Sequence, residues 1–290
     1  MTSTPKQETA KEPLVRNISD TALWVAVYRA RETDRTDALF RDPYARRLAG
    51  ERGEQIARTS AKASPEWPYI ARTVRFDQIT SELIKQGADM VINLAAGLDT
   101  RPYRMELPPS LQWVEVDLPA ITDYKEQILR EEKPRCVLQR VRMDLADVSA
   151  RRKLFQELGA KAKQALIITE GLLVYLSRDE VSALGRDLAA QPTFRDWATD
   201  LCSPGLLKML QKQLPILGEA GSPLKFGPEE GPGFFTTVGW KPVEVYSMLK
   251  TAAKIKRLPF GPLRLVALLP ESNGRQGSRP WGGVCRLTRI

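Results

Sequence analysis

Short apolar runs alternate with segments of helical periodicity at intervals of roughly 20–30 residues, and this alternation constrains the fold more than any other feature. Strands that are buried on both faces read as nearly continuous apolar runs. The pattern therefore predicts an α/β fold in which a mostly parallel sheet, joined by right-handed crossovers, carries helices on both faces. The first five strands are expected over residues 90–96, 111–116, 137–141, 165–169 and 193–199.

Helix signals fill the gaps between these strands. Pro119 opens a helix that is expected to end near residue 131, and a second helix is expected over 149–158. Ser177 and Glu180 have the spacing of a capping box, which predicts a helix start after the fourth strand.

The regular alternation of strands and helices ends in the last third of the chain. Residues 202–239 are rich in Gly and Pro and are interpreted as an inserted loop or helical segment. A helix is expected over 242–249. Strands over 263–269 and 283–287, joined as a hairpin through 272–278, then complete a seven-stranded sheet.

Three helices are expected before the first strand, starting near Asp20, Pro43 and Trp67. The third should extend to residue 85, because Gly87 follows it. The expected organisation is one domain over 1–290: a disordered tail (1–15), an N-terminal helical cap (16–88), a Rossmann-like core (89–200 and 255–290), and a lid insertion with a helix (201–254).

Composition excludes several classes of protein. The chain has no histidine, which excludes Ser-His-Asp and Cys-His catalysis and removes the commonest metal ligand, so we expect no metal. The three distant cysteines, Cys136, Cys202 and Cys285, favour buried thiols in a reducing cytoplasm over disulfides. No apolar run approaches the roughly 20 residues that span a bilayer, so no membrane is expected.

The net charge of +9 is concentrated in one segment. Residues 241–290 carry ten basic and two acidic side chains, a net charge of +8. A solvated helix end explains this excess most simply. The alternative is that it attracts an anionic substrate or a nucleic acid, although no aromatic-interleaved RNA motif accompanies it.

The residues that follow each strand are the candidates for ligand contact, because ligands bind at the carboxyl ends of parallel strands. Ala95 to Gly97 follows the first strand, where glycine permits a close backbone approach. The spacing is not the GxGxxG that holds a pyrophosphate, so a nicotinamide cofactor is disfavoured. Asp117 lies 20 residues beyond Gly97, the offset of an acid that accepts ribose hydroxyls; its alternative role is an N-cap for the helix at Pro119.

Two further strand ends also carry acids. Asp144 and Leu145 follow the third strand and are placed for an adenine, with an N-cap as the alternative for Asp144. Glu170 follows the fourth strand beside the flexible Gly171. Acids at three successive strand ends would attract a sulfonium or an ammonium and repel a pyrophosphate.

These motifs together resemble the leucine carboxyl methyltransferase family, in particular its bacterial branch of S-adenosyl-L-methionine-dependent methyltransferases. The resemblance extends from about residue 16 to the end of the chain and implies the class I methyltransferase form of the Rossmann-like fold. The matching stretches are DALFRDPYA (37–45), ARTVRFD (71–77), NLAAGLDTRPYR (93–104), EVDLP (115–119) and TEGLLVYL (169–176).

The resemblance also implies roles for single residues toward S-adenosyl-L-methionine. Arg72 would bind the methionine carboxylate, and Glu170 would lie at the same end. The loop from Ala95 to Gly97 would run beneath the methionine part. Asp117 would accept the ribose hydroxyls, while Asp144 and Leu145 would contact the adenine.

Two positions depart from the family pattern. The first glycine of the family's Gly-x-Gly loop is Ala95 in this chain, so the backbone approach there should be looser. Eukaryotic members carry a lysine on the first helix that holds the cofactor carboxylate, and the corresponding position here is Val25. A protein C-terminal leucine is therefore a doubtful acceptor.

The expected function is O-methylation of a small molecule that presents a carboxylate or a hydroxyl. A carboxylate is already ionised and needs no general base, which agrees with the missing histidine. A hydroxyl would need a base, for which Tyr175, Asp200 and Glu170 are the candidates. The N-terminal helices and the 202–239 insertion would form a lid. The insertion's aromatic residues, Phe226, Phe234, Phe235 and Trp240, either line an acceptor pocket or simply pack the insertion against the body.

Three alternatives remain open: a nucleic-acid methyltransferase that uses the basic C-terminal segment, a nicotinamide-dependent oxidoreductase, and a non-catalytic protein that binds S-adenosyl-L-methionine. A monomer or a homodimer is expected, and nucleic acid is not the favoured partner.

Overall fold

A seven-stranded sheet with the strand order β3-β2-β1-β4-β5-β7-β6 forms the centre of the computed structural model, which describes residues 19–60, 65–259, 261–270, 277 and 279–290. Strand β7 runs antiparallel to β5 and β6, and the other pairs are parallel. The strands are β1 (Met90–Leu94), β2 (Gln112–Asp117), β3 (Val137–Arg142), β4 (Ala165–Thr169), β5 (Phe194–Cys202), β6 (Trp240–Ser247) and β7 (Gly282–Arg289).

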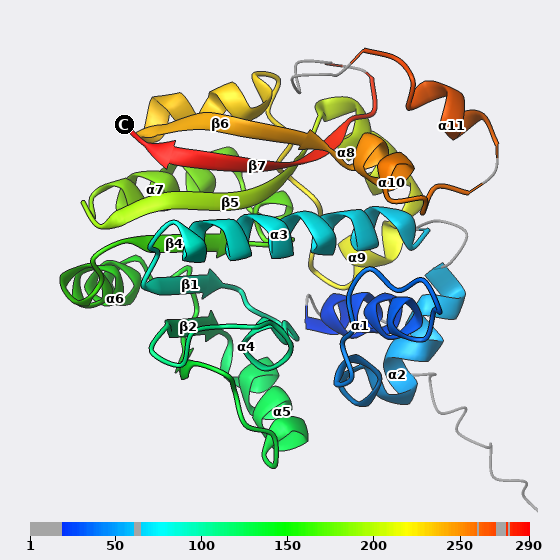
Figure 1. Ribbon diagram of the computed structural model, residues 1–290. Helices are drawn as coiled ribbons and strands as arrows, with labels where there is room; N and C mark the ends of the chain where they lie inside the picture. Colours follow the sequence, from blue (N-terminus) through cyan, green and yellow to red (C-terminus); the bar gives the residue numbers. More distant parts are fainter. Residues whose placement is uncertain (1–18, 61–64, 260, 271–276, 278) are drawn as a thin grey trace, which may run out of the picture.

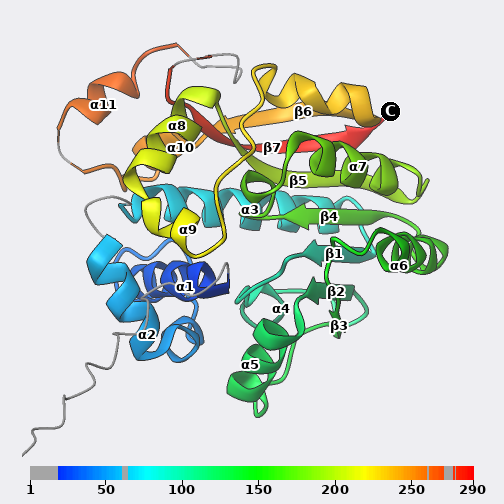
Figure 2. The same cartoon turned by 180° about the vertical axis from the view of Figure 1, so that it is seen from behind.

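Helices cover both faces of this sheet, because alternate side chains of the central strands point to opposite sides. Helix α3 (Trp67–Lys85) crosses the face seen in Figure 1, where Phe76 and Ile79 pack with Val91 of β1. Helices α6 (Val148–Lys161) and α7 (Arg178–Ala189) cover the other face, seen in Figure 2, and share a core with Ile92. The predicted α/β fold with helices on both faces is confirmed.

The expected positions of the first five strands agree with the structure to within a few residues, and α3 has its predicted bounds. The predicted capping box at Ser177 and Glu180 is also present at the start of α7. The remaining elements of the central region are α4 (Arg101–Arg104), α5 (Pro119–Leu129) and the 3₁₀ helix η1 (Leu173–Tyr175).

Two C-terminal predictions are wrong. The helix expected over 242–249 is mostly the edge strand β6, whose Val243, Val245 and Tyr246 favour extended backbone. Pro242 is tolerated there because the pairing with β7 shifts register between Pro242 and Glu244. The strand expected over 263–269 is largely the short helix α11 (Pro262–Val266), and β6 takes its expected place beside β7. The predicted hairpin is therefore wrong, and its 272–278 connection lies almost entirely outside the described residues.

Helices gather beyond the carboxyl ends of β1, β4 and β5, at the right of Figure 1. The expected N-cap Asp20 lies within the first turn of α1 instead and pairs with Arg52. The predicted tail at 1–15 lies outside the described residues, and no helix in the described part is long and apolar enough to cross a membrane. The helices beyond the carboxyl ends of the strands are α1 (Ser19–Thr33), α2 (Ala45–Ser60), α8 (Pro204–Gln213), α9 (Pro215–Glu219) and α10 (Met248–Lys254). The 3₁₀ helix η2 (Gly231–Val238) packs near α7 and β6 instead.

Candidate active site

A cavity of about 1180 Å³ lies at the carboxyl ends of β1, β2, β4 and β5. Ligand sites in proteins usually measure roughly 300–1,000 Å³, so this cavity has room for two small molecules at once. Its inner wall is made by the polar residues that follow the strands. Its outer wall is made by apolar side chains from α1 and from the segments α8 to α11.

Arg72 of α3 connects two of these strand ends. Its Nε lies 3.1 Å from Glu170 Oε1, and its Nη1 lies 3.2 Å from Asp200 Oδ2. The guanidinium also lies over the ring of Tyr69, 5.4 Å from the ring centre. Nη2 of Arg72 donates no hydrogen bond to any residue in the described part of the chain. This nitrogen can therefore bind an anionic group in the cavity.

Arg101 extends the ion-pair network into the interior, although sequence reasoning gave it no role. Its side chain is 97% buried and lies 2.9 Å from Glu170, 2.9 Å from Asp99 and 2.7 Å from Asp77. Burial opposes ionisation of Asp99, but Arg101 and Lys125 outweigh it and lower the pKa of Asp99 to about 2. The sequence signal for Arg101 was its place in the 93–104 motif.

The charges of this network leave the inner wall acidic. Three arginines meet four carboxylates, so the ionised network has a net charge of −1. Asp117 adds a further carboxylate at the same wall. A cation gains from such a site, whereas a pyrophosphate is repelled. The members of the network are Arg72, Asp77, Asp99, Arg101, Arg104, Glu170 and Asp200.

Asp117 holds the loop that follows β1. Its Oδ2 accepts the Gly97 N–H at 2.6 Å, and its Oδ1 accepts the Leu118 N–H at 2.7 Å. A carboxylate offers about four acceptor positions, so about two stay available on the cavity side. Asp117 lines the cavity and is suited to accept two hydroxyl donors, such as those of a ribose.

The same loop has an unusual backbone. Ala95 has a φ of 54° and Gly97 a φ of 48°, both in the left-handed region that favours glycine. For Ala95, which has a Cβ, this conformation costs roughly 1–2 kcal/mol. Gly171 also has positive φ, and a Cβ there would lie 3.1 Å from Arg72 Nη1. Gly171 therefore leaves room for the arginine.

Asp144 and Leu145 do not line the cavity. Asp144 is exposed, and its Oδ1 accepts the Ala146 N–H at 2.9 Å. The N-cap of α6 is Asp147, so the N-cap alternative for Asp144 is wrong. Leu145 is half-buried and packs against the core. The cavity ends near Asp117 and Ile121, and an adenine contact at Asp144 and Leu145 stays a prediction.

Tyr175 and Asp200 both line the cavity, but neither is arranged as a free base. Burial raises the pKa of Tyr175 to about 12, so its hydroxyl stays protonated near neutral pH. Burial also raises the pKa of Asp200, but its two oxygens are engaged by Arg72 and by the Gly171 N–H. Glu170, the third candidate, is shared by Arg72 and Arg101.

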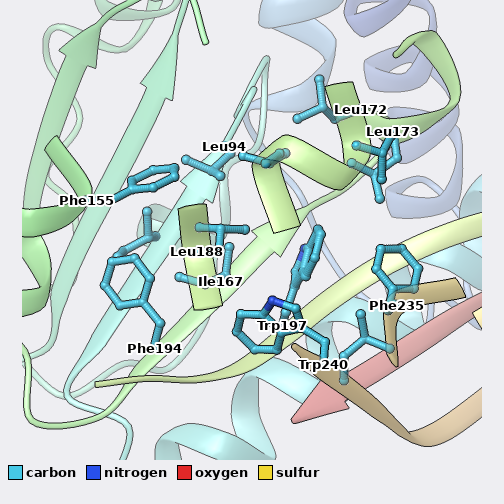
Figure 3. Close-up of a cluster of buried hydrophobic side chains, with 14 of the residues drawn as sticks. Leu94, Phe155, Ile167, Leu172, Leu173, Leu188, Phe194, Trp197, Phe235 and Trp240 are labelled. Atoms are coloured by element: carbon cyan, nitrogen blue, oxygen red, sulfur yellow. The ribbon is translucent and has the colours of Figure 1, made fainter. Parts of the chain in front are cut away.

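The predicted aromatic wall divides between two environments. Phe226 lines the cavity. Phe235 and Trp240 instead pack edge-on against Trp197 in the core, as Figure 3 shows, and Phe234 packs against Phe235. The packing alternative therefore holds for three of the four, because the η2 turn that carries Phe234 and Phe235 folds back onto α7 and β6.

The basic C-terminal segment is partly neutralised by ion pairs, most of them with acids from elsewhere in the chain. Arg257 pairs with Glu32 at 2.8 Å and with Asp37 at 3.0 Å. Arg286 pairs with Asp196 and Glu244. These arginines connect elements of the fold and so do not favour a nucleic-acid surface.

The described residues contain neither a disulfide nor a group of side chains that could hold a metal ion. All three cysteines are free and buried. Within these residues no cluster of Cys, Asp and Glu has the arrangement of a metal site.

Comparison with known proteins places these features in a family. A sequence profile described as leucine carboxyl methyltransferase matches residues 22–189. Two relatives, each named "Putative S-adenosyl-L-methionine-dependent methyltransferase", come from Mycobacteroides abscessus and Parafrankia sp. The first is 34% identical over 61% of this chain and 64% of its own length, so the chain spans just under two thirds of that relative. The second is 32% identical over 79% of each chain.

Solved structures agree in fold. A protein from Thermobifida fusca described as a "putative methyltransferase" aligns over 96% of each chain with a TM-score of 0.59 and 18% identity. A duf574 family protein from Streptomyces avermitilis aligns over 90% of this chain and 96% of its own, with a TM-score of 0.57 and 14% identity. At these identities the likeness concerns the fold, which is the class I methyltransferase form of the Rossmann-like fold.

Proposed function

Since the chain belongs to the leucine carboxyl methyltransferase family, we propose that it is an S-adenosyl-L-methionine-dependent O-methyltransferase that acts on a carboxylate or hydroxyl of a small molecule. The observation that carries the proposal is the convergence of Arg72, Asp117, Glu170 and Asp200 on one cavity that also has a large apolar wall. The same convergence agrees less well with a nicotinamide dinucleotide, whose pyrophosphate would meet these carboxylates.

We infer partners on the inner wall for the carboxylate, the ribose and the cationic groups of the proposed cosubstrate. Nη2 of Arg72 would bind the methionine carboxylate while Nε and Nη1 keep Glu170 and Asp200 in place. Asp117 would accept the ribose hydroxyls with the positions that Gly97 and Leu118 leave open. The acidic wall would attract the sulfonium and the ammonium. Since Val25 stands where eukaryotic members have lysine, Arg72 would be the principal partner of the carboxylate.

The reaction requires placement more than proton transfer. When bound, the sulfonium supplies a methyl group to which the acceptor oxygen bonds while the S–CH₃ electron pair stays on sulfur. The chain would align the acceptor, a contribution that can reach ~7–11 kcal/mol of barrier. Because Tyr175 is protonated and both Glu170 and Asp200 are ion-paired, a carboxylate acceptor suits the site better than an unionised hydroxyl.

The test is incubation of the protein with methyl-labelled S-adenosyl-L-methionine and a panel of carboxylic acids, phenols and alcohols. We expect label in organic-extractable product that is released by mild base, as an ester would be. Base-stable label on a phenol or alcohol would replace the carboxylate by a hydroxyl. Tight cosubstrate binding without label in any acceptor of either class would contradict the enzymatic proposal.

A further inference from the structure

The two halves of the cavity differ sharply in chemistry. The carboxylates that line it are Asp99, Asp117, Glu170 and Asp200, and all four belong to strand ends on the inner side. The outer half is built from apolar side chains of the α8 to β7 region. Representative members are Leu206, Met209, Leu210, Leu217, Phe226 and Trp281.

The segment around α11 adds a second apolar wall. Leu263, Val266 and Leu269 recur every three residues and line the cavity, although they are 38%, 46% and 59% exposed. Leu265 and Leu268 lie between them, are even more exposed, and do not line the cavity. The segment therefore has one apolar row toward the cavity and another toward solvent.

A ligand with its own apolar surface would cover Leu263, Val266 and Leu269, the row that lines the cavity. Each buried CH₂ contributes about 0.8 kcal/mol, so an extended hydrocarbon could gain much of its affinity here. The charged residues that line the cavity next to these walls, Lys250 and Arg279, are both basic. At the outer half they favour the entry of an anionic ligand over a cationic one.

We propose that the methyl acceptor is a lipophilic carboxylic acid whose hydrocarbon part lies along this outer half. The cavity is continuous, so the carboxylate would lie beside the bound sulfonium, whose positive charge offsets the acidic wall, while the chain extends toward Leu263, Val266 and Leu269. This inference rests on the proposed function for the reaction itself, but the apolar binding site can be tested without any methyl transfer.

The first experiment measures binding of unbranched alkanoic acids with six to fourteen carbons by calorimetry, with S-adenosylhomocysteine present. We expect Kd to fall by at least twofold for each added CH₂, toward the about fourfold that complete burial gives, until the cavity is filled. A Kd that does not change with chain length would overturn the apolar site.

Matched double variants locate the hydrocarbon. In V266D/L269D, the two new charges face the cavity; in L265D/L268D, the same charges stand on the same segment but outside it. We expect the first variant to weaken tetradecanoate binding at least tenfold and the second to stay within twofold of the parent protein. Thermal unfolding of both variants shows whether the fold is kept.

Two other results would overturn the assignment. Equal losses of binding in both variants would mean that the lipid does not lie specifically along the cavity row. The solvent-facing Leu265 and Leu268, which could also meet a membrane surface or a second copy of the chain, would then contribute equally. Unchanged binding in both would exclude the segment altogether.

Methyl transfer from labelled cosubstrate separates the two proposals. Esterification that rises with chain length supports both. Equal esterification of short and long acids would contradict the lipophilic acceptor and leave the proposed function standing. Chain-length-dependent binding without esterification, for acids and alcohols alike, would contradict the proposed function and leave the apolar site standing.

Discussion

The inner and outer halves of the cavity are built on opposite principles. The inner half consists of buried charges at the ends of parallel strands and on α3, which Arg72 and Arg101 join into one ion-pair network. The outer half consists of partly exposed apolar side chains on short helices that follow β5 and β6. Buried ion pairs fix geometry, because loss of one partner leaves an uncompensated charge. Apolar contacts are non-directional and tolerate ligands of varied shape.

This difference suggests a division of labour. A cosubstrate that is the same in every reaction would use the rigid half, and an acceptor that varies between relatives would use the adaptable half. The following variants test that division, from the largest expected effect to the smallest.

Arg72→Met should produce the largest effect. It would leave Asp200 without its ion-pair partner and weaken the support of Glu170, at a cost of about 3 kcal/mol in unfolding free energy at pH 8. Met209→Ala in the outer half, where the residue is 38% exposed, should cost less than about 0.5 kcal/mol. Urea denaturation measures both.

The Arg72→Met loss should shrink at pH 5. Burial raises the pKa of Asp200, and removal of Arg72 would raise it further. A group whose pKa is higher in the folded state binds protons on folding, so its contribution to stability is present at low pH and is lost as pH rises. Urea denaturation at both pH values measures this change. Losses of similar size in Arg72→Met and Met209→Ala at pH 8 would contradict the contrast between the halves.

Asp99→Asn should have the next largest effect. The pKa of Asp99 is about 2 in the folded protein and near 4 in an unfolded chain, so its ionised form stabilises the fold above about pH 4. We expect a loss of about 2 kcal/mol at pH 7 that disappears as pH falls toward 2. Denaturant unfolding of the parent protein and of Asp99→Asn across this pH range measures the loss. A difference in unfolding free energy that stays constant with pH would show that charge is not the cause.

Asp117→Ala should weaken binding of S-adenosyl-L-methionine at least tenfold, about 1.4 kcal/mol, because the ribose acceptor and the partner of the Gly97 N–H are lost together. Asp123→Ala is the matched control, since Asp123 is exposed, pairs with Arg142 and does not line the cavity. Calorimetry measures the dissociation constant of S-adenosyl-L-methionine for both variants. An unchanged dissociation constant in the first variant would remove the ribose assignment.

Ala95→Gly should have a small effect of the opposite sign. Relief of the left-handed strain gains roughly 1–2 kcal/mol, and the extra freedom of glycine in the unfolded chain costs about 0.4–1 kcal/mol. We expect a net stabilisation of about 0.5 kcal/mol, measured by denaturant unfolding. A destabilised variant would mean that Ala95 is not strained.

The sequence predicted the centre of the sheet well because burial there leaves a direct signature. Residues 165–168 are apolar and form, with Thr169, the strand β4, which is buried on both faces. The acids at strand ends could be located for the same reason, since a strand that is correctly predicted also locates its end. Asp117 and Glu170, which follow the second and fourth strands, line one cavity, whereas Asp144 after the third strand does not.

The C-terminal region could not be predicted in this way, because its apolar residues are not buried between layers. Edge strand β6 is half-exposed and contains Pro242, so it lacks the apolar run of a central strand. Residues 263–269 are mostly apolar, but Leu263, Val266 and Leu269 line a cavity, and a strand and such a wall have similar compositions. The place of Arg101 depends on ion pairs between residues distant in sequence, which no local pattern contains.

A crystal structure with S-adenosylhomocysteine tests the central claim most directly. We expect the ribose hydroxyls within hydrogen-bond distance of Asp117, the amino-acid carboxylate at Arg72, and the sulfur facing the apolar half of the cavity. A nucleoside bound elsewhere, or one whose carboxylate avoids Arg72 while Asp117 turns away from the ribose, would contradict the account.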